Sequence, residues 1–321
     1  MKSFLILCLK LLSLALIVVS IAGYFSSAHQ TLELISHLRI LFAAAGLVLL
    51  LLSASLKNIM AIGLAAFALL INLAAIAPLY LPGQTLSQSE NNTSISGEPH
   101  KVKLMQFNLW GGKNQKYFAV VQTIVKNNPD IIGFSEITPT WLIALKAGLI
   151  NYPYMIADTT GGGIAIFSRL PLESKEIRYF SELKRPRAIA KIRLARGHFT
   201  LIFAHPFTPI RKWPLRNQEF AFYAKEAKEA ASTGPVIVAG DLNCTPWSSD
   251  FSKLLTDGNL SDTEQGFGPQ PSWNVQLKVP LFPIDHCLVS KNITTLKRYT
   301  GEDVGSDHLP VVVDLEMRIK N

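Results

Sequence analysis

Three long apolar runs and many shorter ones divide the chain into two parts. The long runs cover residues 4–25, 40–56 and 59–81, and only Lys10 places a charge inside one of them. A helix needs about 20 apolar residues to cross a bilayer core, so the first and third runs are long enough. The second run has 17 residues and is at the lower limit. The pattern predicts a membrane anchor over residues 1–83 with three transmembrane helices.

The few charges of this anchor indicate its orientation. Lys2, Lys10 and Lys57 fall on one side of a three-helix anchor. Arg39 falls on the other side. Positive residues favour the cytoplasmic side, which predicts a cytoplasmic N-terminus and a C-terminal domain on the exported side. A second interpretation takes residues 1–28 as a cleaved signal peptide, which leaves the domain on the same side. Because ionisable groups are rare at bilayer depth here, an anchor is favoured over a channel or transporter.

A polar segment separates the anchor from a domain of ordinary composition. Residues 84–100 are rich in Ser, Asn and Gln and predict a flexible linker. Charged residues make up about 6% of residues 1–83 but about 21% of residues 84–321. The second figure is typical of soluble globular proteins. We therefore expect a second domain over residues 101–321, large enough for one sizeable core.

Short β-type runs alternate with helical patterns in this domain, which indicates a mixed α/β fold with more strands than helices. Several strands are apolar throughout, as expected for strands that other layers cover on both faces. The predicted strands are 102–108, 130–135, 163–168, 188–194, 199–205, 236–240, 284–289 and 311–316, and the predicted helices are 115–127, 139–149, 214–232 and 248–257.

Polar side chains follow six of the apolar runs. Side chains at strand ends can converge on one rim of a sheet, where open α/β folds bind ligands. For each ending alone, turn chemistry or a structural histidine is the favoured interpretation. Six such endings in one domain leave the structural and the functional interpretations about evenly matched. The residues are Asn108, Glu136, His205, Asp241 with Asn243, Asp285, and Asp307 with His308.

The order of these motifs resembles the endonuclease/exonuclease/phosphatase superfamily, in a membrane-anchored, bacterial-type member. The resemblance runs over about residues 101–316, and its most specific parts are the Gly-Asp-Leu-Asn of 240–243 and the Ser-Asp-His of 306–308. Ser135 stands before the glutamate where family members commonly carry Gln. The resemblance implies a four-layer α/β sandwich, in which two packed mixed β-sheets are flanked by helices. It also implies a bacterial inner-membrane protein.

Phosphate-ester hydrolysis needs positive charge close to the phosphoryl oxygens. Carboxylate and amide oxygens suit Mg²⁺, with Mn²⁺ as the alternative, better than Zn²⁺. Our hypothesis is that Glu136 is the principal metal ligand, assisted by Asn108 and Asp307.

The remaining residues of the set are assigned to catalysis. Asp241 is expected to orient or deprotonate the attacking water, and Asn243, two residues along an extended chain, to donate to a phosphoryl oxygen. His308 is the expected imidazole at the scissile phosphate, with Asp285 as its orienting partner. His205 matches a family position where some members hold a histidine that contacts the phosphate.

Other residues carry weaker signals. Arg169 and Arg187 are possible phosphate contacts, although a structural or solvated role is favoured. For residues 211–213 together with Arg216, ordinary surface is favoured over a nucleic-acid or lipid contact. Trp273 fits a place beside the substrate or in the core. In an exported domain Cys244 could pair with Cys287, but two separate buried thiols are the favoured interpretation.

These observations predict a membrane-anchored, magnesium-dependent phosphoesterase of the phosphodiesterase or nuclease type. The alternatives are a phospholipid or sphingomyelin phosphodiesterase, a phosphomonoesterase of the same fold, and an inactive binding module. The last is disfavoured because no residue of the predicted set is missing. Residues 101–321 carry 27 Lys and Arg against 20 Asp and Glu, a modest excess that favours polyanions or an anionic membrane surface without choosing between them. Expected partners are a phosphate-ester substrate and the lipid bilayer, and the sequence indicates no obligate protein partner.

Overall fold

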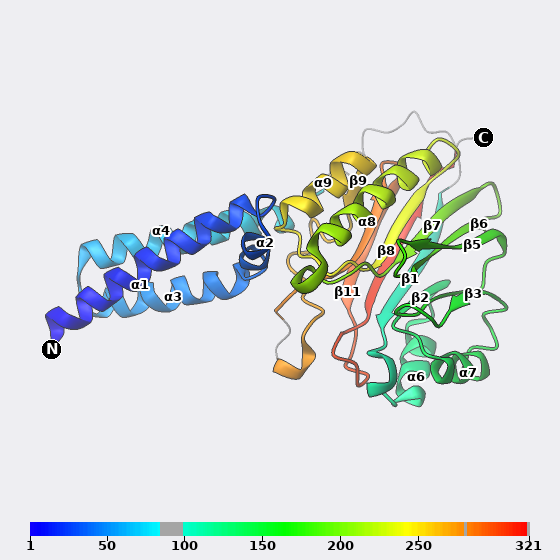
Figure 1. The fold of residues 1–321 in the computed structure, drawn as a ribbon, viewed down its shortest axis with the longest axis horizontal. Coiled ribbons are helices and arrows are strands. Elements are labelled where there is room, and N and C mark those ends of the chain that lie inside the picture. The colour runs from blue at the N-terminus through cyan, green and yellow to red at the C-terminus, as the bar shows by residue number, and fades with distance from the viewer. Residues whose placement is uncertain (84–98, 279–280, 320–321) are drawn as a thin grey trace.

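A computed structural model describes residues 1–83, 99–278 and 281–319. An elongated helical bundle projects from one side of a larger α/β domain (Figure 1). Most of the predicted linker, residues 84–98, lies outside the described residues.

The bundle consists of α1 (Lys2–Ala22), α3 (Arg39–Ser55) and α4 (Ile59–Ile76). Short 3-10 turns extend α1 and α4, and the extended helices Lys2–Phe25 and Ile59–Tyr80 are long and apolar enough to cross a membrane. A third span exists only if α2 (Gln30–Ser36) and α3, which are bent by 60°, count as one. Two of the three predicted spans are therefore confirmed as candidates by length and composition.

Polar side chains inside the bundle satisfy one another near its domain-facing end. The Asn72 amide donates to Ser20 Oγ at 2.8 Å, and Arg39 donates to the Ser20 carbonyl at 2.7 Å. Arg39 also donates to Asn72 Oδ1 at 3.3 Å. Buried polar groups of this kind hold apolar helices together. The single amide of the third apolar run is thus explained by packing.

The α/β domain contains two six-stranded sheets. The first has the order β11-β12-β1-β2-β4-β3, and the second has the order β5-β6-β7-β8-β10-β9. The strands of the first sheet are β1 (His100–Asn108), β2 (Ile131–Ser135), β3 (Tyr154–Asp158), β4 (Ile164–Ser168), β11 (Ile293–Thr300) and β12 (Val311–Met317). Those of the second are β5 (Leu172–Phe180), β6 (Arg185–Arg193), β7 (His198–Ala204), β8 (Val236–Asp241), β9 (Leu260–Asp262) and β10 (Asp285–Ser290).

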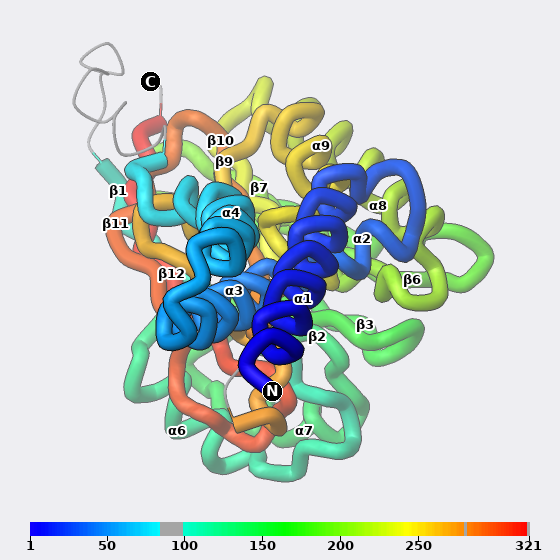
Figure 2. The backbone as a smooth tube through the Cα atoms, turned by 90° about the vertical axis from the view of Figure 1, so that its left-hand side faces the viewer, coloured from blue at the N-terminus to red at the C-terminus, as the bar shows by residue number. Residues whose placement is uncertain are grey.

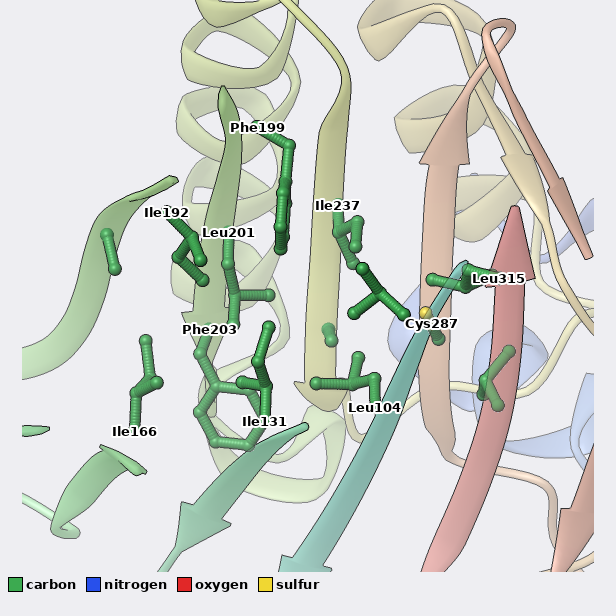
Figure 3. Close-up of a cluster of buried hydrophobic side chains, with 14 of the residues drawn as sticks. Leu104, Ile131, Ile166, Ile192, Phe199, Leu201, Phe203, Ile237, Cys287 and Leu315 are labelled. Atoms are coloured by element: carbon green, nitrogen blue, oxygen red, sulfur yellow. The ribbon is translucent and has the colours of Figure 1, made fainter. Parts of the chain in front are cut away.

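The two sheets pack face to face over the largest hydrophobic core. Figure 3 shows Leu201 and Ile237 of one sheet facing Leu104 and Leu315 of the other. Gly133 lies directly under the Phe203 ring, where a Cβ atom would come within 2.1 Å of the ring. A glycine at this point of β2 therefore lets the aromatic ring fill the space between the sheets.

Helices cover the outer face of each sheet. Helices α6 (Tyr117–Asn127) and α7 (Pro139–Gly148) pack on the first sheet around the buried Trp141. Helices α8 (Pro209–Ala230) and α9 (Ser249–Gly258) pack on the second. The predicted four-layer sandwich is confirmed. Helix α8 has non-helical dihedral angles at Lys212 (φ −140°, ψ 37°), so a short first turn from Pro209 is joined across a kink to the main helix, which begins close to the predicted start at residue 214.

The predicted anchor, residues 1–83, docks on the domain through α2. Figure 2, which looks along the bundle, shows α2 beside α8. Glu33 of α2 pairs with Arg216 of α8 at 2.8 Å, and both side chains are completely buried. Ser248 Oγ lies within 2.9 Å of both Glu33 carboxylate oxygens. The interpretation of Arg216 as ordinary surface is therefore wrong: it is the buried partner of the only acidic residue in the anchor.

Further contacts join the anchor to the α9 side of the domain. Ser249 N donates to Ser26 Oγ at 2.8 Å, and His37 Nδ1 lies 2.8 Å from Thr245 Oγ1. The Leu79 carbonyl at the end of α4 accepts from two backbone amides, Gly266 and Gly268, at 2.9 and 2.8 Å. The domain-facing ends of the bundle helices are therefore fixed to the domain at several points.

Candidate active site

The strand topology brings the predicted site residues to one end of both sheets. Strands β1 and β2 are parallel, so Asn108 and Ser135 lie side by side where these strands end. Strand β8 ends at Asp241, opposite Asp285 at the start of the antiparallel β10. Gly240 has φ +137°, and a Cβ atom there would lie 1.9 Å from the Ala204 carbonyl oxygen of the neighbouring strand. The glycine of Gly-Asp-Leu-Asn thus allows the close strand approach that places Asp241.

Asn108 lies between two carboxylates: Glu136, the predicted metal ligand, and Asp241, the predicted base for the attacking water. Its Nδ2 donates to Asp241 Oδ2 at 2.9 Å and to Glu136 Oε1 at 3.3 Å. Its Oδ1 accepts from the Trp110 amide at 3.0 Å. The carbonyl of Asn108 accepts from Ser306 Oγ at 2.6 Å, which ties the segment before His308 to β1. Asn108 therefore orients both acids and retains one amide lone pair for a ligand.

His308 and Asp285 form a buried hydrogen-bonded pair. His308 Nδ1 lies 2.7 Å from Asp285 Oδ2, and His308 Nε2 lies 3.6 Å from Asp241 Oδ2. Burial alone would lower the pKa of His308, but the charges of Asp285 and Asp241 outweigh it and raise that pKa above its usual range. The two carboxylates on either side therefore favour the protonated form of the imidazole.

Asp241 is the centre of the cluster. Burial raises the pKa of its carboxyl, and the Asp285 charge adds to this, whereas His308 and the Asn108 hydrogen bond oppose it. A carboxylate with a raised pKa accepts a proton more readily, as a general base must. His205 Nε2 lies 3.5 Å from Asp241 Oδ2 and 4.0 Å from Glu136 Oε1. Burial and the Arg185 charge lower the pKa of His205, which keeps this second imidazole neutral.

Glu136 and Asp307 both line the cavity with carboxylate oxygens, the type of ligand that binds a divalent metal. Asp307 Oδ1 is buried and accepts no hydrogen bond from any residue that the structure describes, while Asp307 Oδ2 accepts from Trp273 Nε1 at 3.1 Å. The Glu136 side chain is 36% exposed and faces the same cavity as Asp307. Carboxylate oxygens without protein donors are the hard ligands that Mg²⁺ and Mn²⁺ favour. Asp241, Asp285 and His308 also offer ligand atoms within 4.8 Å of one another.

Asn243 lines the cavity in a different conformation from the one expected. Its φ is +52°, so the chain has left the extended conformation of β8 and the same-side argument from strand geometry does not hold. A turn brings Asn243 back instead: its amide N–H donates to Asp241 Oδ1 at 2.9 Å. Its side-chain Nδ2 donates to the Pro206 carbonyl at 3.1 Å. One side-chain N–H of Asn243 is left for a ligand.

A cavity of about 950 Å³ lies above this cluster. Six of the eight predicted residues line it and make its floor, namely Glu136, His205, Asp241, Asn243, Asp307 and His308. Asn108 touches two of these, Glu136 and Asp241. Asp285 reaches it only through His308. Trp273 lines the cavity, so of its two predicted places, beside the substrate or in the core, the structure supports the first.

Sequence analysis missed two parts of this cavity. Arg185 lines it and is fixed by donating to the carbonyls of His205 and Pro206, the latter at 3.1 Å. The wall opposite the floor includes Leu34, His37 and Leu38 of the anchor. The available signal was Glu33, a lone acid in an otherwise apolar and basic anchor.

The other arginines and the cysteines have structural roles. Arg187 is buried and pairs with Glu226 at 2.6 Å. Arg169 stacks on Tyr152, with the guanidinium carbon 4.7 Å from the ring centre. Cys244 and Cys287 are separate buried thiols. Each of these findings agrees with the favoured interpretation from sequence.

A second buried polar cluster lies behind β10. His286 Nδ1 lies 3.7 Å from Asp262, and Arg298 lies 3.8 Å from Glu264. Arg298 also donates to the Asp285 carbonyl at 2.9 Å. The two acids are balanced by one arginine and one imidazole, so the cluster supports the strand that carries Asp285.

A known protein family matches the part of the chain that carries these site residues. A model of the endonuclease/exonuclease/phosphatase family matches residues 105–308, from β1 to His308. The chain belongs to the endonuclease/exonuclease/phosphatase family. Members of this family hydrolyse phosphate esters and generally depend on a divalent metal. No curated protein sequence matches the chain.

Solved structures share the fold of the α/β domain. An endonuclease/exonuclease/phosphatase family protein from Bacteroides thetaiotaomicron is 19% identical, with a TM-score of 0.61 over 69% of this chain and 97% of its own. A mannosyl-6-phosphatase from the same species is 21% identical, with a TM-score of 0.59 over 67% and 99%. D. rerio TDP2 in complex with a single-strand DNA product is 18% identical, with a TM-score of 0.59 over 67% and 98%.

Proposed function

We propose that the protein is a membrane-anchored, magnesium-dependent phosphoesterase of the phosphodiesterase or nuclease type. The observation that carries this proposal is the continuous set of contacts from Glu136 through Asn108 and Asp241 to His308 and Asp285. It joins carboxylates that suit a divalent metal, a carboxylate of raised pKa and an imidazole of raised pKa at the floor of one cavity. Together these are the parts that metal-assisted hydrolysis of a phosphate ester needs.

The metal ligands are assigned to one edge of the cluster. Glu136 and Asp307, which line the cavity, would hold Mg²⁺ or Mn²⁺, and Asn108 would assist through its side-chain oxygen. When bound, the ion supplies positive charge to a phosphoryl oxygen or the leaving oxygen. The donation from Asn108 to Glu136 fixes the carboxylate before the ion arrives.

Asp241 and His308 carry the proton transfers. Asp241 accepts a proton from the attacking water, because burial has raised its pKa and Asn108 fixes one of its oxygens. His308 donates from Nε2 to the phosphate, because Nδ1 is held by Asp285. Positioned acid–base groups of this kind typically contribute about 10²–10⁴-fold to rate.

Asn243 and His205 bind the phosphate in this scheme. The remaining N–H of the Asn243 side chain donates to a phosphoryl oxygen. His205 lies between Asp241 and Glu136 as a neutral imidazole, so it can donate to the phosphate without competing with the metal by charge.

We place the domain on the exported side of a bacterial inner membrane. The end of α1, the start of α3 and the end of α4 lie nearest the domain, whereas the N-terminus and the turn between α3 and α4 lie at the opposite end of the bundle (Figure 1). In the sequence, Lys2 follows the N-terminus and Lys57 belongs to that turn. Positive residues at the end far from the domain support a cytoplasmic N-terminus. A reporter that is active only in the cytoplasm, fused after residue 321, is expected to give no signal.

Metal-dependent hydrolysis by the purified full-length chain in detergent tests this function. Asp241→Asn keeps the shape of the side chain and removes the base, so hydrolysis of bis(p-nitrophenyl) phosphate in the presence of Mg²⁺ should fall by about 10²-fold or more. Asp257→Asn, on the exposed face of α9, is the matched control. Full activity in Asp241→Asn would remove the proposed base, and a wild-type protein that hydrolyses neither this diester nor any other phosphate ester would favour the binding-module alternative.

A further inference from the structure

The cavity over the candidate active site is built partly by the membrane anchor. Leu34, His37 and Leu38 line it from the α2 side, and Pro209 and Ile210 line it from the first turn of α8. Gln30 of α2 donates to the Pro209 carbonyl at 2.8 Å, which holds these two walls together. The anchor is therefore part of the substrate cavity as well as a tether.

The two halves of this cavity differ in chemistry. Its floor carries the acids and imidazoles described above, together with the Arg185 guanidinium. Its anchor-side wall carries Leu34, Leu38 and Ile210, and Ile210 is 62% exposed. A cation and metal ligands suit a phosphate, whereas the exposed Ile210 and the partly buried Leu34 and Leu38 suit an apolar group attached to it.

The position of α2 places the apolar wall at the level of the membrane surface. Helix α2 lies between the last turn of α1 and the first turn of α3 (Figures 1 and 2). The ends of both helices, and that of α4, contact the domain. If these helices cross the bilayer, the wall lies where lipid headgroups meet the acyl chains. A lipid phosphate could reach the floor while its apolar part stays beside Leu34 and Ile210.

The docking of α2 is specific. Glu33 is buried beside Arg216 and Ser248, and uncompensated burial of a carboxylate would be costly. A flexible tether alone needs no such pair. The contacts fix the apolar wall relative to Asp241 because Arg216 and Asn243 belong to the same side of the domain, with Arg216 Nη1 3.5 Å from the Asn243 carbonyl.

We infer that the substrate is a phosphate ester of a membrane lipid, which enters the cavity along the wall formed by α2 and the start of α8. This inference rests on the proposed hydrolase function and names its substrate class. A soluble nucleic acid or sugar phosphate would gain nothing from an aliphatic wall supplied by the anchor. Hydrolysis adds one water across a P–O bond, so the lipid leaves as an alcohol and a phosphate-bearing product, with no other reactant.

The test compares lipid and soluble substrates for the same full-length protein. Mixed micelles of phosphatidylethanolamine, phosphatidylglycerol and phosphatidic acid are incubated with protein and Mg²⁺, and phosphorus-containing products are measured by mass spectrometry. Parallel reactions contain bis(p-nitrophenyl) phosphate or plasmid DNA. We expect lipid hydrolysis to exceed plasmid cleavage. Cleavage of bis(p-nitrophenyl) phosphate or DNA with intact lipid would overturn the lipid inference while leaving the phosphoesterase function in place.

Variants in the apolar wall provide a second test of the lipid inference. In Leu38→Gln and Ile210→Gln the ratio of the lipid rate to the bis(p-nitrophenyl) phosphate rate should fall at least about fivefold, because each removes an apolar contact from the wall. Ile143→Gln, an equally exposed isoleucine on α7 outside the cavity, is the matched control and should keep the ratio. An unchanged ratio in both wall variants, or an equal fall in the control, would overturn the inference. If the wild-type protein hydrolyses none of these substrates, the proposed function itself would be overturned.

Discussion

Glu33 and Arg216 form an ion pair with a 2.8 Å separation and no solvent exposure on either side chain. The pair connects the short helix between two apolar helices to the helix that covers the second sheet. Arg216 also contacts Asp250 at 2.9 Å, so the guanidinium lies between two acids. The contact makes the N-terminal helical bundle and the α/β domain one structural unit.

Breaking this pair is expected to destabilise the whole protein. Glu33→Gln leaves the buried Arg216 with one charged partner, and loss of a buried partner typically costs about 3–5 kcal/mol. The full-length protein in detergent should therefore show a clear fall in Tm. Glu229→Gln, in the exposed pair with Lys225, is the control and should stay within about 0.5 kcal/mol of wild type. A fall of equal size in both variants would contradict the role assigned to Glu33.

The Asp285–His308 contact predicts a coupled loss of activity. Asp285→Asn removes the charge that holds His308 Nδ1, so kcat should fall by about 10²-fold or more with little change in KM. If Asp285 acts only through His308, the double variant with His308→Ala should be no slower than His308→Ala alone. Additive losses in the double variant would show that Asp285 has an independent role.

Glu219 predicts a pH-dependent stability. Burial raises the pKa of this carboxyl to about 7, against hydrogen bonds from the Phe207 amide and the Tyr223 hydroxyl. Between the unfolded pKa near 4.5 and the folded value, only the folded state holds the proton, so stability falls as pH rises through this window. The Glu219→Gln substitution removes the titrating group, and with it this fall in stability. Relative to wild type, its free energy of unfolding should gain up to about 3 kcal/mol from pH 5 to pH 8.

Denaturant unfolding of both proteins at the two pH values measures this difference. Glu229→Gln, which changes an exposed glutamate on the same helix, should show no comparable pH dependence. A Glu219→Gln protein that loses stability relative to wild type as the pH rises would contradict the sign of the prediction.

The sequence predicts the interior of the fold better than its margins. The eight predicted strands correspond to the eight interior strands of the two sheets, because covering layers require apolar runs there. The four strands that were missed, β3, β5, β9 and β11, are the four sheet edges. Edge strands face solvent and carry polar residues, as the Leu172–Phe180 strand does, so their pattern resembles that of loops.

The site floor was predictable for a related reason. A polar residue that directly follows a buried strand stands out against the apolar run, and strand pairing then decides its neighbours, as it does for Asp241 and Asp285. The cavity wall was not predictable in this way. Leu34 and Leu38 have an ordinary apolar character, and only the buried Glu33–Arg216 contact between distant segments places them at the site.

Magnesium dependence of hydrolysis by the full-length protein tests the central claim most directly. Removal of divalent ions with a chelator should abolish hydrolysis of bis(p-nitrophenyl) phosphate, and added Mg²⁺ should restore it. Glu136→Gln removes the principal proposed ligand, so it should need at least about tenfold more Mg²⁺ for half-maximal rate. Glu302→Gln, a surface change near Lys126, should match wild type. Hydrolysis that persists without metal, or an unchanged Mg²⁺ requirement in Glu136→Gln, would contradict the account.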